Sequence, residues 1–233
     1  KLKHSSGNGT IINAPAANPS ADITLKAPST TGSAGQVLAV ASANHSSTNA
    51  ELEWIANGGA TGRTVLEQFF SPCDGSVIAT SAGNVTLPNV TAQQTLTTSY
   101  ADITGSSITY TPPSGATQVI YELHLYKAAA DDSGIHHQKL FLDSDEVTKA
   151  RMTHRATALY DGIFLVTKWG FNIGGSADTS VGRVASWSSG KTIKATAREY
   201  ASSNETAFHE TGSWDGGAAA HLVLPSIGIT AIG

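Results

Sequence analysis

Alternation of apolar and polar residues with a period of two dominates the chain from about residue 75 onward. In the run 119–126, one face would carry Val119, Tyr121, Leu123 and Leu125. In the run 192–200, Ile193 shares a face with alanines, opposite lysine, threonine and arginine. Successive side chains of a strand point to opposite faces, so each run predicts a half-buried β-strand.

Turn residues separate these runs at short intervals. Pro-Pro-Ser-Gly at 112–115 precedes the first run, and Asp-Ser-Asp-Glu at 143–146 predicts a hairpin turn. The run 163–169 is apolar on both faces and is expected to form a central strand. Strands about every ten residues, with little sign of helix, predict an antiparallel β-sandwich of two sheets. The predicted core comprises Val119, Tyr121, Leu123, Leu125, Phe164, Val166, Ile193 and Leu222.

Residues 1–62 have a different character. They are rich in Gly, Ser, Ala and Asn, contain short β-like pieces, and end in the glycine-rich run 58–62. Prolines interrupt the pieces, and few large residues are present to close a core. We expect an extended or short-stranded N-terminal arm or shaft, ordered by winding with copies of itself or lying on a neighbour. The head domain then spans 63–233.

Composition narrows the classes of function. The net charge of −4 and the pI of about 6.0 argue against a broad nucleic-acid surface and against docking to anionic lipid. No apolar run reaches the length of a membrane span, so no membrane insertion is expected. Cys73 is the single cysteine and is expected to be a buried small apolar residue.

No motif for catalysis stands out, and we expect no enzyme activity, no catalytic residue and no cofactor. The segment 188–192 ends like a phosphate-binding loop, but Ala185 replaces the first glycine that the motif requires. His136 and His137 are adjacent, so on a strand they would point to opposite faces and would not share a metal ion. We therefore predict no metal site, although one histidine from each subunit of a trimer could hold an axial ion.

Three segments resemble a known group of proteins. They are Ser99 to Glu122 (SYADITGSSITYTPPSGATQVIYE), Ala34 to Gly59 (AGQVLAVASANHSSTNAELEWIANGG), and the ending TGSWDGG with LPSIGITAIG. These segments are similar to parts of virion structural proteins of marine phages and algal viruses, especially tail-fibre and appendage proteins with a C-terminal jelly-roll-like head.

The resemblance implies a structural protein of the virion surface, a homotrimer that contacts other virion proteins and contributes to host attachment by non-catalytic binding. A capsid-decorating protein is the alternative within this class. A glycan-degrading depolymerase and a secreted lectin-like module are alternatives from other classes.

Receptor contacts are expected on loops, because loops vary while the sandwich holds them in place. A host cell-surface glycan would suit aromatic side chains, whose flat faces stack on sugars. The aromatic candidates for stacking are Trp169, Trp187, Trp214, Tyr126, Tyr160 and Tyr200. The two preferred loops supply the receptor-binding candidates Trp214, Asp215, Asp131, Asp132, His136 and His137.

Overall fold

The structure is a computed structural model that describes residues 2–3, 9–10, 24–33, 36–46, 49–56, 63–129, 134–156, 162–211 and 221–233. The chain divides into two compact units, Lys1–Gly62 and Arg63–Gly233. The boundary lies directly after the glycine-rich run 58–62 of the sequence. No helix in the described ranges is long and apolar enough to cross a membrane.

In its described residues, the first unit contains strands of 2 to 10 residues. β1 (Leu2–Lys3) pairs with β2 (Gly9–Thr10), and a three-stranded sheet follows, in which β5 (Asn49–Ala56) lies between β3 (Thr24–Lys26) and β4 (Gln36–His45). The indole of Trp54 donates a hydrogen bond to the carbonyl of Thr30, at 2.8 Å. This sheet leaves several large apolar side chains exposed, namely Leu25, Val37, Leu38, Val40 and Ile55.

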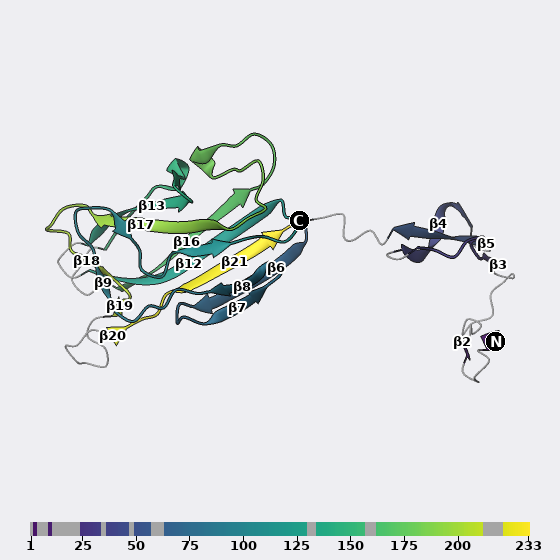
Figure 1. Cartoon of the computed structure of the whole chain (residues 1–233), viewed down its shortest axis with the longest axis horizontal. Helices are drawn as coiled ribbons and strands as arrows, with labels where there is room; N and C mark the ends of the chain where they lie inside the picture. The colour runs from purple at the N-terminus through teal and green to yellow at the C-terminus, as the bar shows by residue number, and fades with distance from the viewer. Residues whose placement is uncertain are drawn as a thin grey trace. The chain divides into compact units, whose positions relative to one another are not determined.

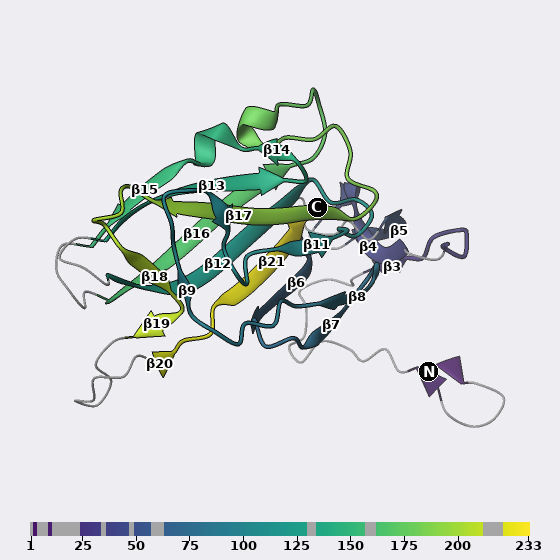
Figure 2. The same ribbon diagram turned by 60° about the vertical axis from the view of Figure 1, so that its left-hand side comes forward.

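The second unit is a sandwich of two antiparallel sheets, which Figures 1 and 2 show as two layers. The first sheet has the order β6, β21, β12, β16, and short β18 and β9 continue it beside β12. Its strands are β6 (Val65–Pro72), β21 (Ser226–Ile232), β12 (Gln118–Ala129), β16 (Gly162–Asn172), β18 (Thr206–Phe208) and β9 (Gln94–Thr95).

The second sheet is built on two central strands. β17 (Lys191–Glu199) pairs with β13 (Ile135–Leu142), β10 and β11 flank β17, and β14 and β15 flank β13. The flanking strands are β10 (Ala101–Asp102), β11 (Ile108–Tyr110), β14 (Asp145–Glu146) and β15 (Met152–Arg155). Outside the two sheets lie the hairpin β7 (Val77–Thr80)–β8 (Gly83–Thr86), the pair β19 (Glu210–Thr211)–β20 (His221–Leu222), and the 3₁₀ turns η1 (Thr148–Ala150) and η2 (Thr179–Val181).

The connections between the sheets follow the jelly-roll order. Eight strands remain in the second unit when β10 with β11 and β14 with β15 are each taken as one broken strand and the short β7, β8, β9, β18, β19 and β20 are left out. Side by side, the first sheet then contains the first, last, third and sixth of these eight strands, and the second sheet contains the second, seventh, fourth and fifth. Two Greek keys wound into two sheets define a jelly roll, so the predicted fold class is confirmed.

The core lies between the two sheets and matches much of the prediction. Val119, Tyr121, Leu123, Leu125 and Ile193 are all buried, as the alternation in their strands predicts. The hydroxyl of buried Tyr121 donates a hydrogen bond to the carbonyl of Ser106, at 2.7 Å. This bond removes the cost of burying a phenol without a partner.

Three predicted core residues are exposed, and the prediction was wrong for them. Phe164 and Val166 lie on the outer face of β16 and are 60% and 46% exposed, while Leu165 between them is buried. Leu165 lies opposite Leu125 in the register and therefore shares its inward face. The sequence had suggested a central strand because β16 is apolar on both faces. In the structure, β16 instead lies at an edge of the sheet, where it pairs with β12. Leu222 lies in the short strand β20, also exposed.

The predicted turn at 143–146 is present and leads from β13 into β14. Asp143 has a φ of 55°, in the left-handed region that Asp tolerates better than most residues. Its carboxylate accepts hydrogen bonds from the backbone of Thr192 at 2.8 Å and from the ammonium of Lys191 at 2.9 Å. Lys191 of the phosphate-loop-like segment is therefore held by a turn, at the start of a strand rather than a helix.

Candidate functional site

Four of the six predicted receptor residues lie outside the described residues. These are Asp131 and Asp132, in the segment 130–133 between β12 and β13, and Trp214 and Asp215, in the segment 212–220 between β19 and β20. Tyr160 also lies outside them. The other two predicted residues, His136 and His137, lie in β13 and point to opposite faces of the sheet.

His136 is not in a surface loop, as the sequence had suggested, but is buried between the sheets. β13 begins at Ile135, so the strand takes up residues that the polar context had assigned to a loop. The imidazole of His136 stacks on that of His154, with ring centroids 4.9 Å apart, and meets the edge of Phe208 at 5.0 Å. A side chain in this position is unavailable for receptor contact.

His136 belongs to a polar end of the core, which it forms with Lys127 and His154. The ammonium of buried Lys127 donates a hydrogen bond to the carbonyl of Gly134, at 2.6 Å. Burial lowers the pKa of Lys127 to about 8. Burial, with the nearby Lys127, His154 and His137, lowers the pKa of His136 to about 2. Both ring nitrogens of His136 lack a hydrogen-bond partner among the described residues.

This polar end does not form a recognisable metal site. The described ranges hold no group of three or more His, Cys, Asp or Glu side chains placed to bind a metal ion. The buried ammonium of Lys127 would also repel a cation here. Glu199, opposite His136 in the strand register, is buried as well, and burial, followed by the charge of Glu205, raises the pKa of that carboxyl.

His137 lies on the outer face of the second sheet, beside a hollow of about 200 Å³. The hollow lies along β13 and β15, and Tyr100, just ahead of β10, closes one side of it. Its lining residues are Tyr100, His137, Gln138, Arg151, Met152 and Thr153. We call it the β13–β15 hollow; the strands that form it appear together in Figure 2.

Hydrogen bonds and ring contacts order the side chains around the β13–β15 hollow. The Nδ1 atom of His137 lies 2.9 Å from the hydroxyl of Thr153, its partner across the strands. The ring of Tyr200, 58% exposed, meets the His137 ring at 5.8 Å. Tyr100, 41% exposed, has the Lys139 ammonium 4.4 Å and the Arg198 guanidinium carbon 5.5 Å from its ring centroid. The surface therefore combines exposed aromatic rings with cations.

Sequence reasoning found Tyr200 and His137 here but missed Tyr100, Arg151 and Arg198. These residues come from segments far apart in the chain and meet only through the strand register, in which His137 lies opposite Arg198. The one available signal was the alternation in β17, which places Arg198 on the outer face.

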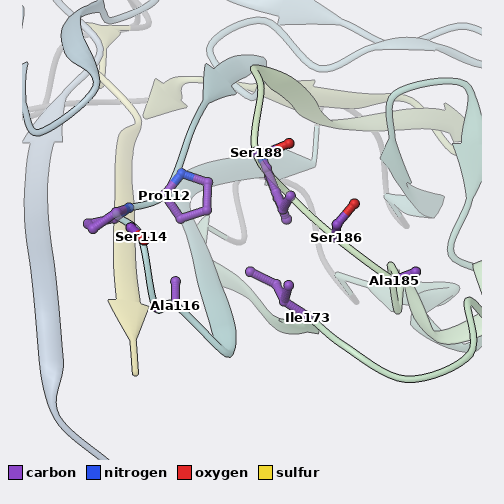
Figure 3. Close-up of a pocket in the computed structure, with 10 residues that line it drawn as sticks. Pro112, Ser114, Ala116, Ile173, Ala185, Ser186 and Ser188 are labelled. Atoms are coloured by element: carbon purple, nitrogen blue, oxygen red, sulfur yellow. The ribbon is translucent and has the colours of Figure 1, made fainter.

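A second hollow, of about 380 Å³, lies near the end of the sandwich where β11 leads into β12. Figure 3 shows Pro112, Ser114 and Ala116 from that connection facing Ala185, Ser186 and Ser188, with Ile173 between the two segments. Trp187 also lines it, but this indole is buried and donates its hydrogen bond to the carbonyl of Tyr110 at 3.0 Å. This hollow offers serine hydroxyls and small apolar surfaces, without a charged residue in its lining.

The outer face of the first sheet carries an aromatic band, formed by Phe70, His124 and Phe164. The His124 ring lies 4.7 Å from that of Phe70 and 5.5 Å from that of Phe164, edge to face in both cases. The ring of Phe70 lies over Gly228 of β21, the strand between β6 and β12. A Cβ added at Gly228 would lie 2.6 Å from this ring. Glycine at this position therefore allows the band to cross the sheet.

The aromatic band is exposed, and the charged side chains beside it form an ion pair. Phe70 is 51% exposed at one end of the band, and Phe164 and Val166 on β16 are similarly exposed. The nearby carboxylate of Glu122 forms an ion pair with Lys168 and lies 3.8 Å from the imidazole of His124. An apolar surface with paired charges is typical of a contact between protein subunits.

Cys73 is buried, as the sequence predicts, and its thiol donates a hydrogen bond to the carbonyl of Gly105 at 3.3 Å. Burial, together with the charge of Asp74, raises the pKa of this thiol to about 12. A thiol that stays protonated is a poor nucleophile, so Cys73 serves packing.

No protein-family model matches the sequence, and no curated protein matches it. Among solved structures, the chain is similar to a chain in a structure of infectious bursal disease virus Gt strain. The identity is 11% and the TM-score is 0.23, over 67% of this chain and 50% of the other. The chain thus covers about half the length of that viral neighbour, and at this TM-score the likeness carries no argument about function.

Proposed function

We propose that this chain is a structural protein of the outer surface of a virus particle, in which the jelly roll 63–233 forms a homotrimeric head. The head contributes to host attachment by non-catalytic binding, and residues 1–62 form the arm that meets other virion proteins. The observation that carries the proposal is the jelly-roll order of the two sheets. Capsid and lectin domains use this architecture, and the three sequence segments described above point to the same class of protein.

The aromatic band supports the trimer. The chain has a net charge of −4, so copies of it carry a net mutual repulsion. The band is apolar and the charges beside it are paired, so two copies can meet there without bringing like charges together. Burying its exposed rings would add the apolar contact that drives association.

The surface hollows support binding rather than catalysis. Arg151 lines the β13–β15 hollow, and the cations of Lys139 and Arg198 lie against the ring of Tyr100, which also lines it. Such a surface binds by stacking and hydrogen bonding, and several copies on one particle would multiply a weak contact.

Mass spectrometry of density-gradient-purified particles, followed by a particle reconstruction, tests this proposal. We expect the chain in the particle fraction, with three jelly rolls around one axis at the outer surface. Recovery of the chain only from the particle-free medium would favour a secreted lectin-like module. Its location in the capsid lattice would favour the decorating protein.

A depolymerase is the remaining alternative and has its own test. Purified chain is incubated with host-envelope polysaccharide, and new reducing ends are measured against a heat-denatured control. We expect none above that control; their release would make the chain an enzyme.

A further inference from the structure

We propose that the β13–β15 hollow, with the adjoining rings of Tyr100 and Tyr200, binds an anionic saccharide. The ligand would be a sugar unit that carries a carboxylate or a sulfate and belongs to a longer chain. This inference rests on the proposed attachment function and assigns it a ligand class and a location, which differs from the two loops selected from the sequence.

Local charge is the first argument. Around the hollow, the described residues include three cations, Lys139, Arg151 and Arg198, and the carboxylate of Glu146. The excess is two positive charges, three minus one, on a chain whose net charge is −4. Lys194 and Asp102 nearby form an ion pair and add nothing to this excess. A local positive field on a negative protein selects for an anionic partner.

Arg198 is held by its backbone contacts. In the part of the chain that the structure describes, it donates two hydrogen bonds, to the carbonyls of Glu199 and Tyr200, and both start from Nη1. A guanidinium carries five N–H groups in a planar fork that matches a carboxylate or a sulfate. Because the backbone bonds fix Arg198 in place, little side-chain entropy is lost when it binds a ligand.

Aromatic rings and neutral donors indicate a sugar rather than a simple ion. Tyr200 is more than half exposed and presents a flat apolar surface, which suits the C–H face of a sugar ring. The hydroxyl of Thr153 and the imidazole of His137 lie beside it and can exchange hydrogen bonds with sugar hydroxyls. Thr153 and His137 lie on the neighbouring strands β15 and β13, and Tyr200 directly follows β17, so the sheet fixes their relative positions.

The size of the hollow limits the contact to one sugar unit. Its volume of about 200 Å³ is below the usual range of about 300–1,000 Å³ for pockets that enclose a whole small ligand. The rest of a polysaccharide would lie across the open sheet face. The larger hollow near residues 112–116 lacks both cations and an exposed ring, which is why we assign the ligand to the β13–β15 hollow.

Binding of the purified full-length chain to immobilised polymers tests the inference. The probes are polygalacturonate for the carboxylate, dextran sulfate for the sulfate, uncharged dextran, and polyglutamate as a polyanion without sugar. We expect binding to one or both anionic polysaccharides and at least tenfold weaker binding to dextran and to polyglutamate. Binding should be largely lost in 1 M salt, where the screening length is about 3 Å. Preference for polygalacturonate or for dextran sulfate then identifies the anionic group.

Variants locate the site. Arg198→Gln and Tyr200→Ala should each weaken binding at least tenfold, one by loss of charge and the other by loss of the ring alone. Arg63→Gln, ahead of β6 in the opposite sheet, removes one exposed cation that bonds to the side chain of Gln118 and should change the affinity less than twofold. Melting curves verify that each variant is folded, and Tyr200→Phe replaces Tyr200→Ala if that variant fails to fold, with retained binding expected.

Several outcomes overturn the inference. Equal binding of polyglutamate, or an equal loss in Arg63→Gln, would show non-specific charge attraction. Unchanged binding in Tyr200→Ala would remove the sugar platform, and loss of binding in Trp214→Ala alone would move the site to that loop. If particles contain the chain on their surface but no anionic polysaccharide binds, this inference fails while the proposed function stands.

Discussion

Three ionisable side chains at the polar end of the core, Lys127, His136 and His154, make the stability of the head sensitive to pH. The pKa of each side chain is lower in the folded chain than its ordinary value, chiefly because burial disfavours the charged form. His136 and His154 are partners on the neighbouring strands β13 and β15 of the second sheet, and Lys127 lies on β12 of the first sheet. Glu199 on β17 lies opposite His136 in the register. The neutral imidazoles are therefore a condition of the folded state.

We predict that the head loses stability as the pH falls below about 6.5. Unfolded histidine takes up a proton near this pH, whereas His136, with a pKa of about 2, does not when folded. The unfolded state then binds more protons, so the free energy of unfolding falls by up to about 1.4 kcal/mol per pH unit for each such histidine. Urea midpoints at pH 7.5, 6.5 and 5.5 measure the effect.

The variant His136→Phe is the matched comparison, because its ring can keep the contacts with His154 and Phe208. Its urea midpoint should depend less steeply on pH than that of the original chain. Equal slopes would show that His136 is already protonated or accessible in the folded state.

Lys127→Met should stabilise the head at pH 7, by about 1–2 kcal/mol. It removes an ammonium that is buried without a carboxylate partner among the described residues, which outweighs the lost bond to the Gly134 carbonyl. The pKa of Lys127 is lowered to about 8 when folded, so the original chain regains stability as the pH rises from about 8 to 10.5. The gain from Met should thus shrink at pH 10. A variant less stable than the original at pH 7 would contradict this.

At the scale of elements, the turn between β13 and β14 depends on Asp143. Asp143→Ala removes its bonds to Thr192 and Lys191 and places a β-carbon without local hydrogen bonds at a φ of 55°. Asp143→Gly also loses the bonds but relieves the backbone. We expect losses of about 1–3 kcal/mol for Ala and about 1 kcal/mol less for Gly. Thermal unfolding ranks the two variants, and a more stable Ala variant would contradict the role of φ.

The elements also show where the sequence is a sufficient guide. β12 alternates clearly, so its inward residues Val119, Tyr121, Leu123 and Leu125 could be predicted. β16 has apolar residues on both faces, and only its register with β12 shows that Leu165 points inward and Phe164 outward. The local pattern of such a strand does not reveal which face is buried.

The candidate site was harder to predict than the fold. Its cations and rings come from β13, β15, β17 and the segment before β10, and no local motif links them. Polarity near His136 suggested a loop, although a buried imidazole in a strand produces the same local sequence. The pairing of strands far apart in the sequence brings the site residues together, and it also buries His136.

At the scale of the whole molecule, we predict that Phe164→Glu prevents assembly of the head. The change places a charge in the aromatic band that we propose as the subunit contact, while the outward position of the side chain leaves the core intact. Light scattering at micromolar concentration should give three chains for the original and one for the variant. Val77→Glu, an equally exposed apolar position on β7, is the control and should remain trimeric. A trimer in both variants would exclude the band as the contact.

The pairing of β6 with β21 has a consequence for synthesis of the chain. β6 is the first strand of the jelly roll and β21 its last, and backbone bonds between Thr64 and Gly233 close their ends together. While the ribosome is still translating the segment between them, β6 has no partner, and β12 exposes the edge that β21 will cover. Long-range pairing of this kind folds slowly, on the order of milliseconds to seconds, and unpaired edges recruit other chains. Nascent copies on one messenger would therefore be most prone to aggregate just before the final strand emerges.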